Sequence, residues 1–123
     1  MLGRYLALVV GAIAAAGLPA RAQAEEAPAG QHDFSRCAAC HSTEPGKNGV
    51  GPSLAGVVGR SSGGAPDYSY STAMKNAHVT WDAATLDRFL ANPQSVVRGT
   101  KMFVNIPDET ARGNVIAYLA TLK

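Results

Sequence analysis

Several features that define other classes of protein are scarce in this sequence. Its 123 residues include two cysteines, and its 11 basic and 9 acidic residues form no long run of either sign. Two cysteines cannot build a disulfide scaffold, and a net charge of +2 without a basic cluster does not indicate nucleic-acid binding. The length allows one ordinary domain, which excludes large barrels and two-domain enzymes. An apolar content of 46% argues against global disorder.

Strand patterns are also missing, and the regular structure that the sequence predicts is helical. No stretch keeps the alternation of apolar and polar residues that is typical of strands. Helical spacing recurs instead in three segments, residues 32–41, 81–91 and 108–122. We expect Thr80 to be the N-cap of the second segment, Asn92-Pro93 to end it, and Asp108 to open the third. The expected fold class is therefore all-α.

The apolar positions of these segments define the expected core. They are Leu86, Phe89 and Leu90 in the second segment and Ala111, Val115, Tyr118, Leu119 and Leu122 in the third. Residues 42–64 and 94–106 are predicted to be irregular, and residues 68–74 to form one helical turn or irregular structure. Short helices and long loops supply little core for a domain of this size. We therefore expect a large apolar cofactor to fill its middle.

The one long apolar run lies at the N-terminus. Arg4 precedes the uncharged segment Tyr5–Leu18, and Ala22-Gln23-Ala24 has the small-residue pattern of a signal-peptidase site. A retained membrane anchor is the alternative, but the run is shorter than the roughly 20 residues needed to span a bilayer. We expect residues 1–24 to be a secretory signal peptide cleaved after Ala24, and residues 25–123 to be one domain exported to the periplasm. Without Arg4 and Arg21, that domain has zero formal net charge.

Both cysteines lie in the segment Cys37-Ala38-Ala39-Cys40-His41, which has the C-x-x-C-H pattern of covalent c-type haem attachment. On a helix the two thiols lie one turn apart on one face, where both could form thioethers with one edge of the porphyrin. His41 would then present its imidazole to the iron. A redox dithiol would need a β-α-β context that is missing here, and a zinc site would need four converging ligands. The pattern predicts one covalently bound haem c.

Four residues could supply the second axial ligand. His32 lies on the same predicted helix as His41 and cannot easily reach the opposite face of a haem, and His78 lies in a polar stretch. Met74 could be a flexible residue that fills a gap in the core. Met102 is the best candidate because it follows a Gly-Thr-Lys segment that the core could hold over the ring.

The order of motifs along residues 30–122 resembles that of class I cytochromes c, of the mitochondrial cytochrome c and bacterial cytochrome c2 type. After the C-x-x-C-H segment come Gly51-Pro52-Ser53-Leu54, Gly56-Val57-Val58-Gly59-Arg60, Tyr68-Ser69-Tyr70, Trp81, Asn92-Pro93, Gly99-Thr100-Lys101-Met102-Phe103 and Ala117-Tyr118-Leu119. This resemblance implies a small cytochrome c fold with three to four main helices and long loops around one haem.

The resemblance also implies a role for individual residues. His41 and Met102 would be the axial iron ligands, and the Pro52 carbonyl would accept a hydrogen bond from His41. The haem propionates would be held by Arg60, Tyr70, Trp81 and Thr100. Gly30 and Phe34 of the first helix would pack against Tyr118 of the last.

The sequence departs from the family pattern at three positions. Phe89 stands where many members have a tyrosine whose hydroxyl touches the methionine sulfur, and Met74 stands where an asparagine is common. Arg98 replaces the proline that usually precedes Gly-Thr-Lys-Met, so a looser methionine segment is expected.

A haem with two protein ligands has no open position for a substrate, so one-electron exchange is the expected activity and an enzyme is not. We expect a monomeric periplasmic carrier between larger redox proteins such as an oxidase, a reductase or a dehydrogenase, with no nucleic-acid partner and no stable membrane insertion. A haem subunit of a periplasmic oxidoreductase complex is the alternative. A gas-binding or peroxidase-like protein would require Met102 to be displaced. Docking is expected at the haem edge beside Arg36, Arg98 and Lys101.

Overall fold

The computed structural model describes residues 29–123, so the expected signal peptide and its cleavage site lie outside the described residues. The described part of the first helix covers residues 29–34. It is followed by α2 (Thr72–Lys75), α3 (Ala83–Ala91), α4 (Pro93–Val96) and α5 (Glu109–Ala120). Over residues 29–123 the only β pairing is an isolated antiparallel bridge between Ser61 and Thr80. The prediction of an all-α fold is confirmed.

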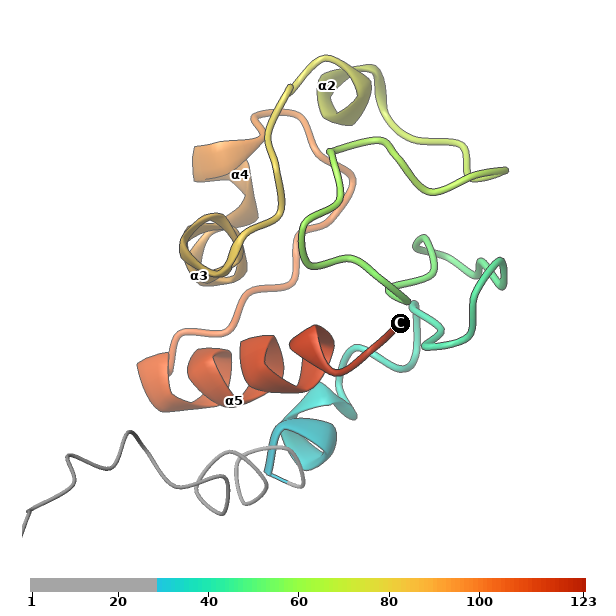
Figure 1. Ribbon diagram of the computed structural model, residues 1–123. Coiled ribbons are helices and arrows are strands. Elements are labelled where there is room, and N and C mark those ends of the chain that lie inside the picture. The colour runs from blue at the N-terminus through green and yellow to red at the C-terminus, as the bar shows by residue number, and fades with distance from the viewer. Residues whose placement is uncertain (1–28) are drawn as a thin grey trace, which may run out of the picture.

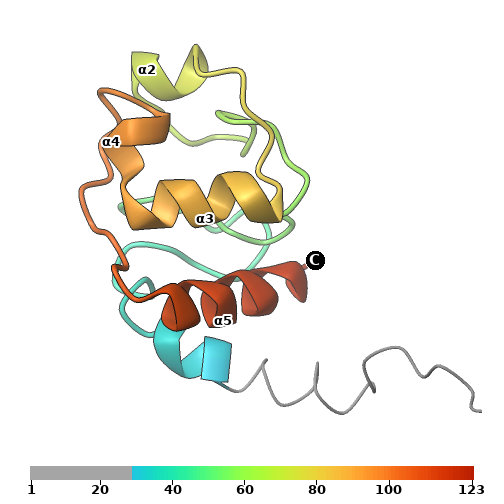
Figure 2. The same ribbon diagram turned by 90° about the vertical axis from the view of Figure 1, so that its left-hand side faces the viewer.

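The core lies between α3 and α5, which are the two longest helices of the described chain. Figures 1 and 2 show α3 on one side of α5 and the N-terminal helix on the other, while long loops form the rest of the molecule. Leu86, Phe89 and Leu90 of α3 are buried, as are Val115 and Leu119 of α5. The other three predicted core positions, Ala111 and Tyr118 in α5 and Leu122 just after it, are partly buried against this cluster.

Side-chain caps explain where the two main helices begin. Asp82, not Thr80, is the N-cap of α3, and its carboxylate accepts a 2.7 Å hydrogen bond from the Thr85 N–H. The prediction for Thr80 was wrong because α3 begins only at Ala83, and Thr80 instead forms an isolated antiparallel bridge with Ser61. Asp108 caps α5 by accepting from the Thr110 N–H at 2.8 Å, which confirms the predicted start.

The first predicted helix is shorter than expected at its C-terminal end. Regular helix stops at residue 34, and residues 35–40 continue as turns. The Ala38 N–H is shared between the carbonyls of Phe34 and Ser35, a three-centre bond that is common at helix ends. The His41 N–H nevertheless donates to the Cys37 carbonyl at 2.9 Å, so the C-x-x-C-H segment still completes one turn.

The packing expected between the two ends of the domain is confirmed. The Phe34 and Tyr118 rings lie 5.2 Å apart between centroids. A Cβ atom on Gly30 would overlap the Asn114 carbonyl, so glycine is needed for the two helices to approach this closely.

Part of the segment expected to be irregular is helical. Asn92-Pro93 does end α3, but Pro93 also opens α4, where a missing N–H and a restricted φ suit the first turn. α2 begins within the stretch that was predicted to form a single turn, and the Ser71 side chain caps it. Within residues 29–123, no helix combines the length and the apolar character that a bilayer crossing requires.

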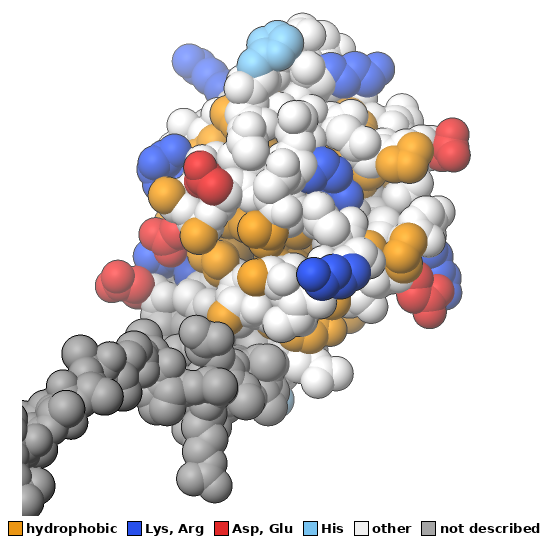
Figure 3. Space-filling model, in the orientation of Figure 1, with side chains coloured by type: hydrophobic (Ala, Val, Ile, Leu, Met, Phe, Trp, Pro, Cys, Tyr) orange, Lys and Arg blue, Asp and Glu red, His pale blue; other side chains and the backbone are white. Residues whose placement is uncertain are grey.

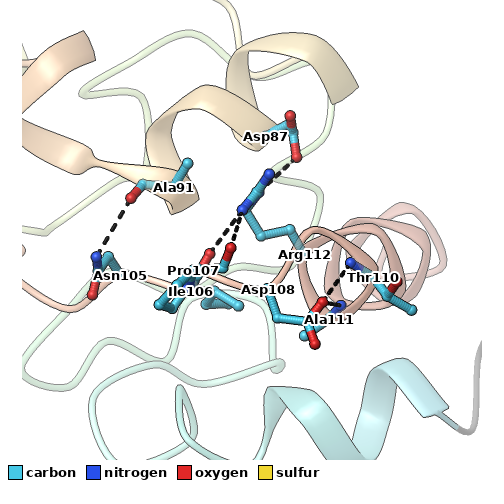
Figure 4. Close-up of polar contacts among 9 residues, drawn as sticks. All are labelled: Asp87, Ala91, Asn105, Ile106, Pro107, Asp108, Thr110, Ala111 and Arg112. Atoms are coloured by element: carbon cyan, nitrogen blue, oxygen red, sulfur yellow. Dashed lines mark hydrogen bonds and ion pairs between the residues drawn. The ribbon is translucent and has the colours of Figure 1, made fainter.

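Arg112 links its own helix, α5, to α3 and to the segment that directly precedes α5 (Figure 4). Its Nε donates to the Asp87 carboxylate of α3 at 2.8 Å, and its Nη1 donates to the carbonyls of Ile106 and Pro107 at 3.1 and 2.9 Å. The Arg112 side chain is 12% exposed, whereas the Asp87 side chain is 45% exposed, so the ion pair is only partly shielded from water. The hydrogen bonds of Arg112 anchor the C-terminal end of the segment that carries Met102.

Candidate functional site

A cavity of about 420 Å³ lies between α3, α5 and the loops. Figure 3 shows apolar side chains gathered around a recess in the middle of one face, with basic side chains beside it. The apolar wall includes Phe34, Leu54, Leu86, Leu90, Val115 and Leu119. Cavities of roughly 300–1,000 Å³ with mostly apolar walls are typical sites for large organic ligands. The cavity therefore occupies the place where the sequence predicts a cofactor.

The C-x-x-C-H segment places all three of its functional side chains on the cavity wall. Cys37, Cys40 and His41 line it, and both cysteines are free and partly buried. Burial is the main cause that raises the pKa of the Cys37 thiol, although nearby Arg36 acts in the opposite direction. Redox-active C-x-x-C pairs have a lowered cysteine pKa instead. The environment of Cys37 therefore does not favour the redox-dithiol alternative.

The His41 ring is oriented by its neighbours. Its Nδ1 lies 2.8 Å from the Pro52 carbonyl, which can only accept, so Nδ1 donates and Nε2 keeps its lone pair for a metal. A Cβ atom on Gly51 would overlap the ring, so glycine lets the backbone pass close to the imidazole. Burial lowers the pKa of His41 and is the largest cause of the shift. All three features suit a neutral imidazole that coordinates iron.

Of the four candidates for a second ligand, the structure brings only the two methionines to the cavity. Met74 from α2 and Met102 both line it. His78 is exposed and has a left-handed backbone with φ 51°. His32 is exposed on the first helix beside Asp33. The site thus offers one imidazole and two thioethers.

Arg60 gives the cavity its most specific polar feature. Its two terminal nitrogens donate to the carbonyls of Ser53 and Ala55 at 3.0 and 3.2 Å. Its Nε is buried, and no atom of the described chain accepts from it. An unpaired buried donor is costly. A carboxylate inside the cavity would accept this hydrogen bond, and haem carries two such groups.

The other residues expected to hold propionates also lie on the wall. The Tyr70 hydroxyl accepts from the Ala65 N–H at 2.9 Å, which leaves its own O–H free to donate. Thr100 is 3% exposed, and its hydroxyl oxygen accepts from the Met102 N–H. Trp81 is 7% exposed and packs edge-on against Phe89, with 4.8 Å between the ring centroids. The shape, the thiols and the unpaired donor together fit a haem.

The mouth of the cavity contains features that were only partly predicted. Arg36 and Lys101 line it, whereas Arg98 is exposed but lies outside the lining. Large apolar side chains are also exposed there. Val50 is 77%, Phe103 78% and Val104 56% exposed in the protein structure. Isolated apolar residues in loops give no periodic signal, so sequence reasoning did not find this rim.

Comparison with known proteins agrees with these features. The sequence model of the Cytochrome c family matches residues 27–123, so the chain belongs to this family. Cytochrome c2 of Rhodoblastus acidophilus is 52% identical over 97 residues, which are 77% of this chain and 91% of that protein. Cytochrome c of Euglena viridis is 49% identical over 90 residues, covering 72% of this chain and 88% of that protein.

Solved structures give the same result. Cytochrome cH from Methylobacterium extorquens aligns with a TM-score of 0.72 at 48% identity, covering 77% of this chain and 97% of that one. Ferricytochrome c2 from Rhodopseudomonas palustris also has a TM-score of 0.72, at 38% identity, and the alignment covers 79% of this chain and 98% of that one. The chain is a class I c-type cytochrome with one covalently bound haem c. It is an electron carrier and not an enzyme.

Proposed function

We propose that this cytochrome is a soluble, monomeric one-electron carrier of the periplasm, with His41 and Met102 as axial iron ligands. In the proposed precursor, residues 1–24 are the signal peptide, cleaved after Ala24, and residues 25–123 are the cytochrome domain. The family match from residue 27 agrees with that boundary. The observation that carries the proposal is one cavity lined by Cys37, Cys40, His41 and Met102.

Each protein group has a defined task at this site. Cys37 and Cys40 would form the thioethers, and the Pro52 carbonyl accepts from the Nδ1–H of His41, which leaves Nε2 free to coordinate the iron. Bound there, the haem would supply one-electron exchange, at a higher potential with imidazole and thioether ligands than with two imidazoles. The apolar wall of the cavity would shield the haem from water and disfavour added charge.

The buried polar donors would neutralise the propionates. Arg60 Nε supplies an N–H that the described chain leaves unpaired. Tyr70, Trp81 and Thr100 line the same cavity and bring further donors. Charge-assisted hydrogen bonds of this kind would offset the cost of burying carboxylates.

The test of ligation is the absorption spectrum of the purified holoprotein in both redox states. We expect a c-type haem spectrum on reduction and a methionine–iron band near the red end in the ferric protein. Met102→Ala should abolish that band, and the matched variant Met74→Ala should keep it, because only Met102 is the proposed ligand. A band that survives in Met102→Ala and disappears in Met74→Ala would assign the ligand to α2 instead.

The distribution of exposed apolar residues favours a free carrier over a subunit of a stable complex. Of the four large apolar side chains exposed in the described chain, Val50, Phe103 and Val104 line the cavity mouth. Val58, the fourth, is 38% exposed. A permanent interface would need a larger apolar surface beyond the haem edge. Sedimentation of the native protein as a complex with a dehydrogenase would favour the alternative.

Docking at the haem edge would be guided by Arg36, Lys101 and Arg98. Residues 25–123 have zero formal net charge, and ionised propionates would make the holoprotein negative. Oxidation of the ferrous protein by anionic hexacyanoferrate(III) separates local from overall charge. A basic rim predicts that the rate falls as salt rises, whereas control by net charge predicts that it rises. Lys101→Gln should weaken the salt dependence, and Lys75→Gln, on the exposed end of α2, should not.

A further inference from the structure

The segment that leads to Met102 is held by one amide side chain. Gln94 of α4 accepts a hydrogen bond from the Gly99 N–H through Oε1 at 3.0 Å. Its Nε2 donates to the Thr100 carbonyl, also at 3.0 Å. Only one orientation of the amide satisfies both partners, because an N–H needs an acceptor and a carbonyl needs a donor. The Gln94 side chain therefore hydrogen-bonds the backbones of two consecutive residues of this segment.

A further hydrogen bond carries this restraint to the proposed ligand. The Met102 N–H donates to the Thr100 hydroxyl at 3.3 Å. Thr100 is nearly fully buried, and its own N–H donates to the Val97 carbonyl at 3.0 Å. The position of Thr100 thus constrains the backbone of Met102, and the hydrogen bond from Gln94 restrains the Thr100 carbonyl.

The sequence gives a reason why such a restraint is needed at this point. Arg98 has no ring to restrict its φ, and Gly99 adopts a left-handed backbone with φ 92°. A residue with free φ followed by glycine leaves this turn with more conformational freedom than a proline would. The two hydrogen bonds made by the Gln94 side chain restrict the conformation of this turn in the folded chain.

We propose that Gln94 is a positioning residue that keeps Met102 over the cavity, and this inference rests on the proposed axial role of Met102. Gln94 lines no part of the cavity and acts only through the backbone of Gly99 and Thr100. Its loss should raise the population in which Met102 has left the iron, without changing the ligand itself.

The experiment measures how easily an external ligand takes the place of Met102. Ferric holoproteins of the wild type, Gln94→Ala, Gln94→Glu and the control Gln31→Ala are titrated with imidazole, and loss of the methionine–iron band is followed. We expect the apparent imidazole affinity of Gln94→Ala to rise about tenfold, because two net-stabilising hydrogen bonds are lost. Gln31 is exposed on the first helix, and its replacement should leave the affinity unchanged.

Gln94→Glu keeps the size of the side chain and an acceptor for the Gly99 N–H, but places an oxygen against the Thr100 carbonyl. It should also bind imidazole more tightly than the wild type, and it provides a second test if the alanine variant folds poorly. Equal affinities in the wild type and both Gln94 variants would overturn the inference, even if denaturant unfolding showed lower stability. A wild-type ferric protein without the band would instead refute the axial role of Met102.

Discussion

The two sides of the cavity are built on different principles. On the His41 side, the two thiols and the proposed ligand come from one five-residue segment, and the imidazole lies against Gly51 and is hydrogen-bonded to Pro52. On the Met102 side, the proposed ligand lies in a segment without regular structure whose ends are tied to α3, α4 and α5. The first side can be recognised from a local motif, whereas the hydrogen bonds that hold the second, near in sequence at Gln94 and distant at Asp87, belong to no motif.

The largest change in stability should come from adding a side chain at Gly51, where the backbone lies against the His41 ring. A Gly51→Ala variant would place a methyl carbon in steric overlap with the His41 imidazole ring, so the backbone and the ring must move apart. We expect the free energy of unfolding to fall by about 3 kcal/mol. The measurement is denaturant unfolding of the ferric holoprotein.

The control for that variant is Gly113→Ala in α5, where an added methyl group would meet no neighbouring atom within 4 Å. Replacing glycine inside a helix should raise the free energy of unfolding by about 0.5–1 kcal/mol. If both glycine variants changed stability in the same direction, the close contact at Gly51 would not be the cause.

A smaller loss of stability is expected when the C-terminal end of the Met102 segment loses its hydrogen bonds to Arg112. Arg112→Ala removes the hydrogen bonds to Asp87, Ile106 and Pro107. We expect the free energy of unfolding to fall by about 1–2 kcal/mol, since three hydrogen bonds from a charged donor are lost but solvent screens the partly exposed pair with Asp87. Asp87→Ala should cost less, because the two carbonyl bonds remain. Calorimetry of both variants beside the exposed-site control Arg88→Ala would test this ranking.

The contrast between the two sides also explains what the sequence could and could not predict. The spacing of Cys37, Cys40 and His41 predicted that they share one site, and all three line the cavity. The apolar faces of α3 and α5 were predicted from their period, because that signal lies within one element. Thr80 was misassigned as a cap because two residues in close succession could serve, and the structure uses the second, Asp82. Gln94 and Arg112 belong to no motif, and their hydrogen bonds follow from how the loop and the helices fold. The role of Met102 was therefore expected mainly from the resemblance, and the hydrogen bonds that hold its segment were found only in the structure.

The smallest effect is a pH dependence at the start of α3. The hydrogen bonds from Thr85 lower the pKa of the exposed Asp82 carboxyl below its ordinary value. Because the folded-state pKa is depressed, this cap stabilises the protein above the ordinary aspartate pKa, and its contribution is lost as pH falls through the folded value. Asp82→Ala should therefore unfold at lower denaturant than the wild type at pH 7. The two should converge in strong acid, and a constant difference across that range would contradict the capping role.

The contact between the two ends of the domain has a consequence for how the chain folds. Asn114 donates to Asp33, a partner 81 residues away, and Phe34 meets Tyr118 beside it. Two cysteines only three positions apart enclose almost no chain, so attachment of the cofactor leaves the unfolded polypeptide nearly as free as before. The entropic cost of bringing the ends together is therefore offset by non-covalent contacts, including the docking of the first helix on α5. Folding rate should consequently respond more to Gly30 and Tyr118 than to any residue of the connecting loops.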